Sequence, residues 1–365
     1  MPPQPVVPDY GGPCLSNLLH ALTAPDPPPW LPSQARGARA HVLLLLDGLG
    51  WKQFMDRKHL MPTLASLEGA PIHSVTPTTT ATALTSITTG LPPAEHGLIG
   101  YRILVDDEVL NVLRWQLDGQ DARTILPPDH MQAVQPFLGM RPPVVTKAEF
   151  GRTGFTQAHL RTARLVGWRV PSSIGVEIAG LVDEGEPLVY GYYDAIDKIA
   201  HAEGLGSHYE AELTCVDDLV SRLLDRLPDD VALLVTADHG QVHVGDRTRQ
   251  LPDDLLDLVD VQSGEGRFRW LHARPGAETD LADAATEFAA HEAWVPTRQQ
   301  VLDERWFGPV PTDALRRLGD VALVPFEPVA YLEPDDSGPF ELIGRHGSLT
   351  EDEVLVPLLC GRGRR

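Results

Sequence analysis

The sequence predicts an α/β fold with a mostly parallel central sheet. Three short apolar runs each end in an acidic residue or a turn, and a segment of helical periodicity separates the last two runs. With 365 residues, of which 42% are hydrophobic and 22% charged, the chain has the composition of a globular protein. This length is typical of two domains, or of one large α/β domain with an insertion.

The first predicted strand spans Val42 to Leu46, a continuous apolar run that ends at Asp47-Gly48. A run this short, closed by a turn, indicates a strand buried on both faces of a parallel sheet, although periodicity alone leaves a buried helical segment open. The preceding residues 1–36 are rich in Pro and Gly, and we expect an extended N-terminal arm there with one short helix near Leu15–Leu22.

Two further apolar runs complete a βαβ unit. Residues Leu188–Tyr193 end at Asp194, and Val231–Thr236 are followed by Ala-Asp-His-Gly. Between them, residues 209–227 carry apolar side chains at helical spacing. A strand, a helix and a strand in this order predict two parallel strands joined by a crossover helix.

We expect a core formed by residues 37–240 and 336–365, with a smaller cap subdomain, residues 241–335, inserted into it. The elements predicted in the cap are a strand at Phe268–Ala273, helices at Leu281–His291 and Thr297–Glu304, and a strand at Val321–Val324. Residues 102–180 are rich in Pro, Asp and Arg, and we expect loops and helices there with a single short strand.

Charge and cysteine content restrict the classes of partner. Acidic residues outnumber basic ones by 51 to 30, so the formal net charge is -21. Nucleic-acid polymers and anionic membranes are bound through basic surfaces, and we expect neither as a partner. The three cysteines lie far apart without a CxxC pair, which argues against disulfides and cysteine zinc sites. In the absence of a recognisable secretory leader or long apolar run, we expect a cytoplasmic location.

Polar side chains are predicted to meet at one edge of the sheet. Asp47, Asp238 and His239 each follow a predicted strand, and ligands of open α/β sheets bind outside the carboxyl ends of the strands. An Asp-Gly pair after a strand is also a common turn. Adjacent Asp and His followed by Gly, directly after an apolar run, are a more specific signal.

A second set of candidate ligands lies elsewhere in the chain. Asp197 and His201 are four residues apart, so on a helix they would share one face, where a carboxylate and an imidazole can chelate zinc. An ordinary surface pair is the alternative role for these two residues. His346, within Gly-Arg-His-Gly-Ser, is the last candidate, with a plain loop position as its alternative.

A threonine cluster precedes a short predicted helix. Residues 81–88 can form this helix, with Gly90 as its terminator, and Thr80 then lies at its N-terminus. Backbone N–H groups and the helix dipole favour an anion there, either a phosphate or a threonine alkoxide. A threonine becomes a nucleophile only when a base or a metal lowers its pKa. Capping of the helix is the alternative role for Thr78, Thr79 and Thr80.

In chain order, these motifs resemble the alkaline phosphatase superfamily, and most closely the nucleotide pyrophosphatase/phosphodiesterase family. The family pattern P-T-x-T, followed nine residues on by T-G and then by H-G, is similar to Pro77–Thr80, Thr89-Gly90 and His96-Gly97. Tyr192 with the Asp-x3-His-x2-Gly that follows resembles another family motif. The resemblance implies a three-layer α/β/α sandwich with a mostly parallel central sheet and a smaller inserted cap.

The resemblance also implies a catalytic nucleophile, Thr80, and two divalent metal ions. Zinc is expected, and manganese or iron can use the same donors. One ion would be bound by Asp47, Thr80, Asp238 and His239. The other ion would be bound by Asp197, His201 and His346.

The sequence departs from the family pattern beside the nucleophile. Where the family has an Asn shortly after its H-G, this sequence has Tyr101, whose phenol can also donate to phosphate or can serve only in packing. The adjacent Arg102 is a second candidate for substrate binding. Residues 81–83, Ala-Thr-Ala, replace the family's Phe-Pro-Asn and alter the pocket wall.

These features predict a two-metal phosphoryl-transfer hydrolase that acts on a small phosphorylated substrate. We expect it to cleave phosphodiester or nucleotide pyrophosphate bonds through a covalent phospho-threonine intermediate. A phosphomonoesterase or a phosphonate hydrolase on the same core is the alternative among enzymes. A catalytically silent binding protein that keeps the fold is the alternative of a different class.

Overall fold

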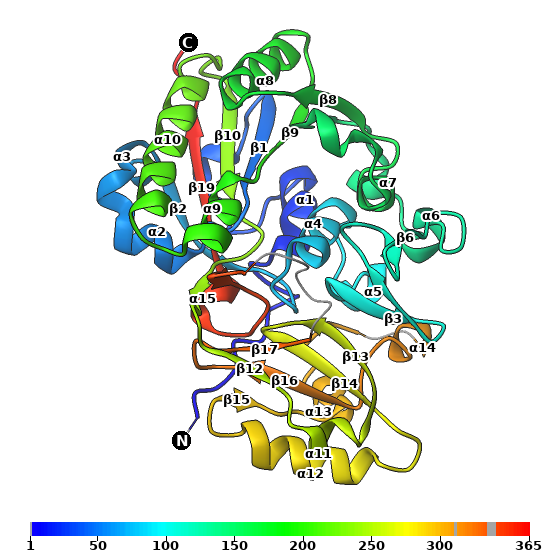
Figure 1. Cartoon of the computed structure of the whole chain (residues 1–365). Helices are drawn as coiled ribbons and strands as arrows, with labels where there is room; N and C mark the ends of the chain where they lie inside the picture. The colour runs from blue at the N-terminus through cyan, green and yellow to red at the C-terminus, as the bar shows by residue number, and fades with distance from the viewer. Residues whose placement is uncertain (1, 310–311, 334–340) are drawn as a thin grey trace.

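The computed structural model describes residues 2–309, 312–333 and 341–365, and a seven-stranded sheet forms its centre (Figure 1). The strand order is β2-β19-β10-β1-β9-β7-β8. All neighbouring pairs from β10 to β8 are parallel, whereas β19 is antiparallel to both β10 and β2. The strands are β1 (Ala40–Leu46), β2 (Glu68–His73), β7 (Pro143–Lys147), β8 (Arg164–Trp168), β9 (Leu188–Tyr193), β10 (Val231–Thr236) and β19 (Leu355–Arg362). The mostly parallel sheet is therefore confirmed.

The three predicted core strands lie side by side in the middle of this sheet. Strand β1 pairs Leu44 with Val235 of β10 on one side and with Gly191 of β9 on the other. Every residue of β9 and β10 is buried, because helices cover both faces, and this burial explains their continuous apolar runs. Val42 to Leu46 belongs to a strand, and the helical alternative is wrong.

Two groups of helices lie on either side of the sheet and complete the three layers (Figure 1). One group contains α2 (Trp51–Arg57), α3 (Pro62–Ala65), α8 (Ile174–Asp183) and α10 (Ser207–Leu224). The other contains α1 (Leu18–Thr23), α4 (Thr80–Thr89) and α7 (Gly154–His159). The helices predicted near Leu15–Leu22 and within 81–88 and 209–227 are thereby confirmed, with a 3-10 turn at Leu15–Asn17 before α1.

The prediction for residues 102–180 is correct for loops and helices and wrong in expecting a single short strand. This segment supplies two strands of the main sheet, β7 and β8, and a separate antiparallel sheet in the order β3-β4-β5-β6. The strands of this small sheet are β3 (Arg102–Val105), β4 (Glu108–Asn111), β5 (Gln116–Leu117) and β6 (Gln120–Asp121). Short helices α5 (Pro93–His96) and α6 (Pro128–Met131) flank it. Its strands are mostly too short to show a clear period of two.

A second antiparallel sheet lies beyond the carboxyl end of the main sheet, in the order β13-β14-β16-β15 (Figure 1). Its strands are β13 (Val259–Glu265), β14 (Phe268–Ala273), β15 (Ala293–Trp294) and β16 (Val321–Pro325). Its helices are α11 (Asp253–Leu256), α12 (Glu278–Ala289), α13 (Arg298–Asp303) and α14 (Thr312–Leu315). The two strands and two helices predicted here are confirmed.

Short strands connect this second unit to the core. They are β11 (Val242–His243) paired with β18 (Gly344–Arg345), and β12 (Thr248–Gln250) paired with β17 (Ala330–Leu332). The predicted domain boundary between residues 335 and 336 lies outside the described residues.

The N-terminal segment packs against the core. Leu15, Leu18 and Leu19 are fully buried, and the Val6 N–H donates a hydrogen bond to the Leu349 carbonyl at 2.9 Å. Among the helices of the described parts of the chain, none is long and apolar enough to cross a membrane.

Candidate active site

The predicted polar residues converge at the carboxyl edge of the main sheet. Asp47 directly follows β1, and Asp238 and His239 come two and three residues after β10. Helix α9 (Ala195–Glu203) begins two residues after β9 and carries Asp197 and His201 on one face, four residues apart. The parallel order of β10, β1 and β9 therefore brings these side chains together.

Asp47, Asp238 and His239 form one cluster with metal-ligand spacing. The His239 Nε2 lies 3.5 Å from Asp47 Oδ1 and 3.5 Å from Asp238 Oδ2. All three side chains are almost fully buried. Asp47 and Gly48 do form the turn expected after β1, and within this turn the Asp47 side chain is buried in the cluster.

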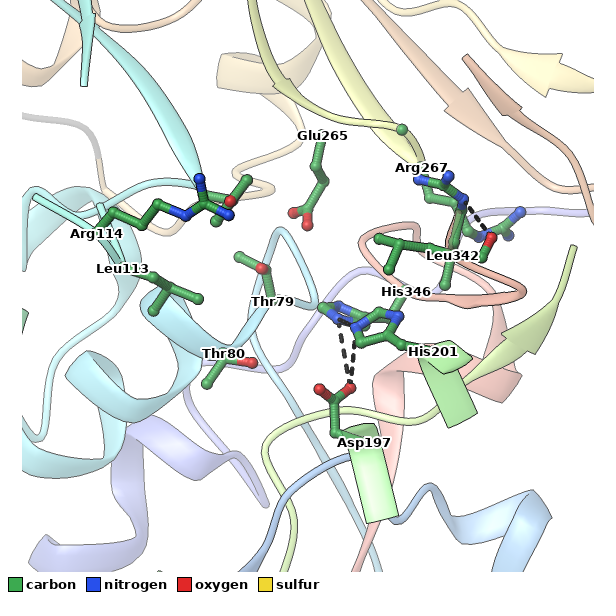
Figure 2. A pocket seen from close by; sticks show the side chains of 13 residues that line it. Thr79, Thr80, Leu113, Arg114, Asp197, His201, Glu265, Arg267, Leu342 and His346 are labelled. Atoms are coloured by element: carbon green, nitrogen blue, oxygen red, sulfur yellow. Dashed lines mark hydrogen bonds and ion pairs between the residues drawn. The ribbon is translucent and has the colours of Figure 1, made fainter. Parts of the chain in front are cut away.

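Asp197, His201 and His346 form a second, adjacent cluster (Figure 2). The Asp197 Oδ1 lies 3.3 Å from His201 Nε2 and 3.7 Å from His346 Nε2. The two Nε2 atoms are 3.3 Å apart. The His346 ring stacks on the His239 ring with 3.6 Å between their centroids, so the two clusters are contiguous.

Backbone carbonyls orient all three histidines. The Nδ1 atom of His201 lies 2.7 Å from the Gly344 carbonyl, that of His239 lies 3.0 Å from Gly240, and that of His346 lies 2.8 Å from Thr78. A carbonyl only accepts, so each Nδ1 carries the proton and each Nε2 presents its lone pair to the clusters. Orientation of a ring through its second nitrogen is a regular feature of metal-ligating histidines.

The buried carboxylates have too few protein donors. Asp47 Oδ1 and Asp238 Oδ2 are buried without a hydrogen-bond partner among the described residues. Burial, then the charges of Asp238 and Asp197, raise the pKa of Asp47 well above its usual value. Burial and the neighbouring His239 and His201 lower the pKa of His346. A bound cation would stabilise these buried acceptors, which have no hydrogen-bond donors of their own.

Divalent cations fit these donors. Two buried carboxylate oxygens without hydrogen-bond partners lie close to three histidine Nε2 atoms that present lone pairs, and these electron-rich atoms are close together at a cost unless a cation binds between them. Zinc is coordinated by nitrogen and oxygen ligands of these kinds. Gln241 supports the second cluster by donating from Nε2 to Asp197 Oδ1 at 2.6 Å, and the Tyr192 hydroxyl donates to Asp47 Oδ2. Tyr192 belongs to a motif that resembles the family pattern, but its contact with Asp47 was not predicted. Gln241 was not identified from sequence, although it directly follows the Asp-His-Gly motif.

Thr80 lies where the two clusters meet. It is the first residue of α4, and its Oγ1 is 3.1 Å from His239 Nε2, to which the hydroxyl donates. Because α4 has ten residues, its N-terminal N–H groups and dipole favour negative charge at this position. The expected C-terminus of the helix is also present, with Gly90 in the left-handed conformation at φ 71°.

Two cavities open at Thr80. The charged cavity has a volume of about 290 Å³ and is lined by Tyr101, Arg114, His201, Glu265, Arg345 and His346 among others (Figure 2). The aromatic cavity has a volume of about 230 Å³ and is lined by Asp47, Phe150, Phe155, Tyr190, Tyr192 and Lys198 among others. Asp197, Leu113 and Thr80 line both cavities, so the candidate nucleophile faces a charged lobe and an aromatic one.

The structure places the two candidate substrate contacts differently. Tyr101 lines the charged cavity, and its hydroxyl accepts a hydrogen bond from Asn111 Nδ2 at 2.8 Å, so its own proton can be donated to a ligand. Arg102 instead forms an ion pair with Glu333. Arg114, which sequence reasoning did not identify, lines the charged cavity.

A buried ion pair stabilises the loop that carries His346. The Arg267 guanidinium pairs with both oxygens of Glu353, with distances of 2.7 and 2.8 Å. Glu353 Oε1 also accepts from the backbone N–H of Ser348, two residues after His346, at 3.0 Å. The pair joins the second sheet to α15 (Glu351–Val354), and its partners lie 86 positions apart in the sequence, so no local sequence signal predicts it.

Solved structures similar to this chain share its fold. A murine ectonucleotide pyrophosphatase/phosphodiesterase 5, inactive through a threonine-to-alanine change and bound to AMP, matches with a TM-score of 0.66 and 15% identity. The match covers 88% of this chain and 87% of that one. A phosphonoacetate hydrolase from Sinorhizobium meliloti, bound to phosphonoacetate, matches with a TM-score of 0.65 and 19% identity over 89% and 91% of the two chains.

Comparison of the sequence with family models gives a match over most of the chain. The model described as type I phosphodiesterase / nucleotide pyrophosphatase matches residues 41–177 and 161–349. No curated protein matches significantly. The matched range contains both clusters and Thr80. The chain therefore belongs to the type I phosphodiesterase / nucleotide pyrophosphatase family of phosphoryl-transfer hydrolases.

Proposed function

We propose that the protein is a two-metal hydrolase that cleaves phosphodiester or nucleotide pyrophosphate bonds through a covalent phospho-threonine on Thr80. The observation that carries this proposal is the position of Thr80 Oγ1, 3.1 Å from His239 Nε2 and at the opening of both cavities. In the murine relative, a threonine-to-alanine change accompanies inactivity, which supports a catalytic threonine.

The two clusters provide the donors for two cations, for which zinc is our proposal. Asp47, Asp238 and His239 would hold one ion together with Thr80 Oγ1, and Asp197, His201 and His346 would hold the other. Bound cations would supply positive charge for a deprotonated threonine and for a leaving oxygen. Manganese or iron could use the same donors, so metal analysis of the purified protein identifies the ion.

In the proposed reaction, Thr80 Oγ1 forms a bond to phosphorus as the bond from phosphorus to the leaving oxygen breaks. The N-terminus of α4 favours the alkoxide form of Thr80, and the Tyr101 hydroxyl can donate to a non-bridging phosphate oxygen. Water then attacks the phospho-threonine, which releases the phosphoryl product and restores the Thr80 hydroxyl. The aromatic cavity has room for an apolar or planar substituent of the substrate.

Charge supports a diester over a monoester. Three Asp carboxylates and one alkoxide carry four negative charges, which two divalent cations balance. A phosphodiester monoanion therefore fits better than a phosphomonoester dianion, which would require an additional cation. The charged cavity does contain arginines, and a solved structure of similar fold is a phosphonoacetate hydrolase, so a phosphomonoesterase or phosphonate hydrolase is the second candidate.

Turnover of three compounds separates these candidates. We expect bis-(4-nitrophenyl) phosphate to be hydrolysed faster than 4-nitrophenyl phosphate, and phosphonoacetate to be a poorer substrate than either. Equal or faster hydrolysis of the monoester, or preferred cleavage of phosphonoacetate, would contradict the diesterase proposal in favour of the second candidate.

Replacement of Thr80 tests the nucleophile. Thr80→Ala should lower kcat for bis-(4-nitrophenyl) phosphate by at least about a thousandfold, because it removes the attacking oxygen. Thr80→Ser keeps a hydroxyl and should retain measurable turnover with a trapped phospho-serine detectable by mass spectrometry. Near-normal activity of the Thr80→Ala protein, with its metal content unchanged, would show that the nucleophile lies elsewhere.

A further inference from the structure

Three arginines line the charged cavity, and they differ in what they already bind. Arg267 is fully buried, and it uses its donors on Glu353 and on the carbonyls of Pro325, Glu327 and Val329. Arg345 Nε donates to the Leu342 carbonyl at 3.2 Å. Arg114 is exposed, and within residues 2–309, 312–333 and 341–365 its guanidinium has neither an ion pair nor a hydrogen bond.

The main chain around Arg114 is held firmly although its side chain is exposed. Asn111 Oδ1 accepts from the Arg114 N–H at 3.1 Å, while Asn111 Nδ2 donates to Tyr101 Oη at 2.8 Å. The next residue, Trp115, is 1% exposed and donates from Nε1 to the Leu126 carbonyl at 2.8 Å. Arg114 therefore projects from an anchored turn, so its backbone does not have to be ordered when the side chain binds a ligand.

The direction of the side chain points to a ligand in the cavity. Arg114, three residues after the end of β4, extends into the space above Thr79, and Arg267 lies on the opposite side of the cavity (Figure 2). The same cavity contains Thr80, where the phosphoryl group would react. A guanidinium without a partner, in a cavity of about 290 Å³ shared with the nucleophile, is suited to a carboxylate or phosphate.

We propose that Arg114 binds a second anionic group on the same substrate molecule that carries the reacting phosphorus. The substrates of this enzyme are accordingly small molecules with two anionic groups, the second being a carboxylate or a phosphate. Asn111 acts as a positioning residue, because it holds the Arg114 backbone and the Tyr101 hydroxyl at once. This inference rests on the proposed function, which places the reacting phosphorus at Thr80.

Glu265 limits the strength of this site. Its carboxylate lies on the wall opposite Arg114 and lines the same cavity (Figure 2). A second anion therefore meets repulsion from Glu265 as well as attraction from Arg114. Glu265→Gln removes the repelling charge, so it should tighten binding of a dianionic ligand while Arg114→Ala weakens it.

A matched pair of probes tests the proposal. Phosphonoacetate has a phosphonate and a carboxylate, and phosphonoacetamide replaces the carboxylate with a neutral amide of similar shape. Calorimetric titration of the metal-loaded Thr80→Ala protein, which should not turn either probe over, measures the two dissociation constants. We expect phosphonoacetate to bind about tenfold more tightly, since a charge-assisted hydrogen bond is stronger than a neutral one.

Substitutions assign the difference to Arg114. In the Thr80→Ala background, Arg114→Ala should reduce the ratio of the two dissociation constants to about one, Arg114→Lys should retain part of it, and Glu265→Gln should increase it. Arg141→Ala is the control, because Arg141 is exposed and lines neither cavity, and it removes the same net charge. It should leave the ratio unchanged.

The outcomes distinguish this inference from the proposed function. Equal affinity for both probes, or a ratio that survives Arg114→Ala, would overturn the role of Arg114 and leave the phosphonyl site at Thr80 intact. Failure of both probes to bind the metal-loaded protein would overturn this inference, whereas the proposed function stands or falls separately with the hydrolysis of bis-(4-nitrophenyl) phosphate by the wild-type protein. A ratio that falls equally in Arg141→Ala would show that net charge, and not Arg114, sets the preference.

Discussion

Asp47 has a different environment at each of its two carboxylate oxygens. Oδ2 accepts a hydrogen bond from the Tyr192 hydroxyl, whereas Oδ1 is buried and has no donor among the described residues. Burial and the charges of Asp238 and Asp197 raise the pKa of Asp47, so the folded protein without metal resists its ionisation. A side chain selected for stability alone would not carry this charge here, and the cost is consistent with a ligand role.

We therefore predict that Asp47→Asn has opposite effects with and without metal. In metal-free protein the substitution should raise the free energy of unfolding at pH 7 by about 2 kcal/mol, because it removes a buried charge without a donor. In metal-loaded protein it should lower stability, because it removes a ligand. Thermal unfolding of both proteins, with and without chelator, measures the two effects.

The pH dependence of metal-free protein checks the same point. The folded-state pKa of Asp47 is raised, so the folded state binds more protons than the unfolded state above pH ~4, and the free energy of unfolding falls as pH rises through the raised pKa. Asp47→Asn should flatten that fall. Asp218→Asn, at an exposed ion pair with Arg222, is the control and should leave it unchanged. An identical decline in both variants would contradict the assignment.

At the scale of elements, the Arg267–Glu353 pair links the second sheet to the loop of His346. Both side chains are fully buried, and Glu353 also accepts from Ser348 N and Thr350 Oγ1. Glu353→Gln leaves the Arg267 charge buried without a counter-charge. We predict a loss of about 3–5 kcal/mol in the free energy of unfolding, measured in urea, together with weaker metal binding at the second cluster.

A neighbouring ion pair provides the control for Glu353→Gln. Lys52 of α2 pairs with Asp352 of α15, the helix that carries Glu353, and the two side chains are 56% and 34% exposed. Lys52→Ala should cost less than about 1 kcal/mol, because exposed pairs are screened by solvent. Equal losses in the free energy of unfolding in the two variants would show that burial does not increase the contribution of the Arg267–Glu353 pair to stability.

The elements that could be predicted from sequence are those with a local signal. Continuous apolar runs predicted β1, β9 and β10, and the polar residues that follow β1 and β10 predicted the meeting of Asp47, Asp238 and His239. The spacing of Asp197 and His201 indicated the second set of candidates, and the family resemblance grouped these two residues with His346. The hairpin of β3 and β4 was missed, although apolar residues flank Asp106-Asp107, which have φ values of 48° and 70°. Two positive φ values in a two-residue loop are typical of a tight hairpin, for which Asp-Asp is a weaker signal than Asp-Gly. The Arg267–Glu353 pair depends on tertiary contact and had no local signal.

At the scale of the whole molecule, the site ties together distant parts of an acidic chain. Its predicted metal ligands extend from Asp47 to His346, and three of the 51 acidic residues lie among them. Without cations these carboxylates repel each other and with cations they are neutralised, so bound metal should stabilise the entire fold.

Chelation is therefore expected to lower the melting temperature of the wild-type protein. Free metal at a thousandfold excess over its Kd contributes about 4 kcal/mol, so removal should lower Tm by roughly 5 °C in a chain of this size. Calorimetry before and after treatment with a chelator, with metal content measured in parallel, tests this. Recovery of Tm on addition of zinc is the control, and an unchanged Tm after complete metal loss would contradict it.

The three carbonyls that orient the histidines have a consequence for mutagenesis. They belong to the main chain of Thr78, Gly240 and Gly344, so no exchange of a side chain can delete the acceptor itself. A Cβ at Gly240 or Gly344 would come within 1.9 Å of the Asp352 carbonyl oxygen or 2.4 Å of the Ala200 carbonyl oxygen. A scan of point mutants would therefore find that Gly240 and Gly344 do not tolerate substitution, because a Cβ clashes there. It would not reveal that the peptide carbonyls of these residues accept hydrogen bonds from the histidines, because no substituted side chain supplies those acceptors.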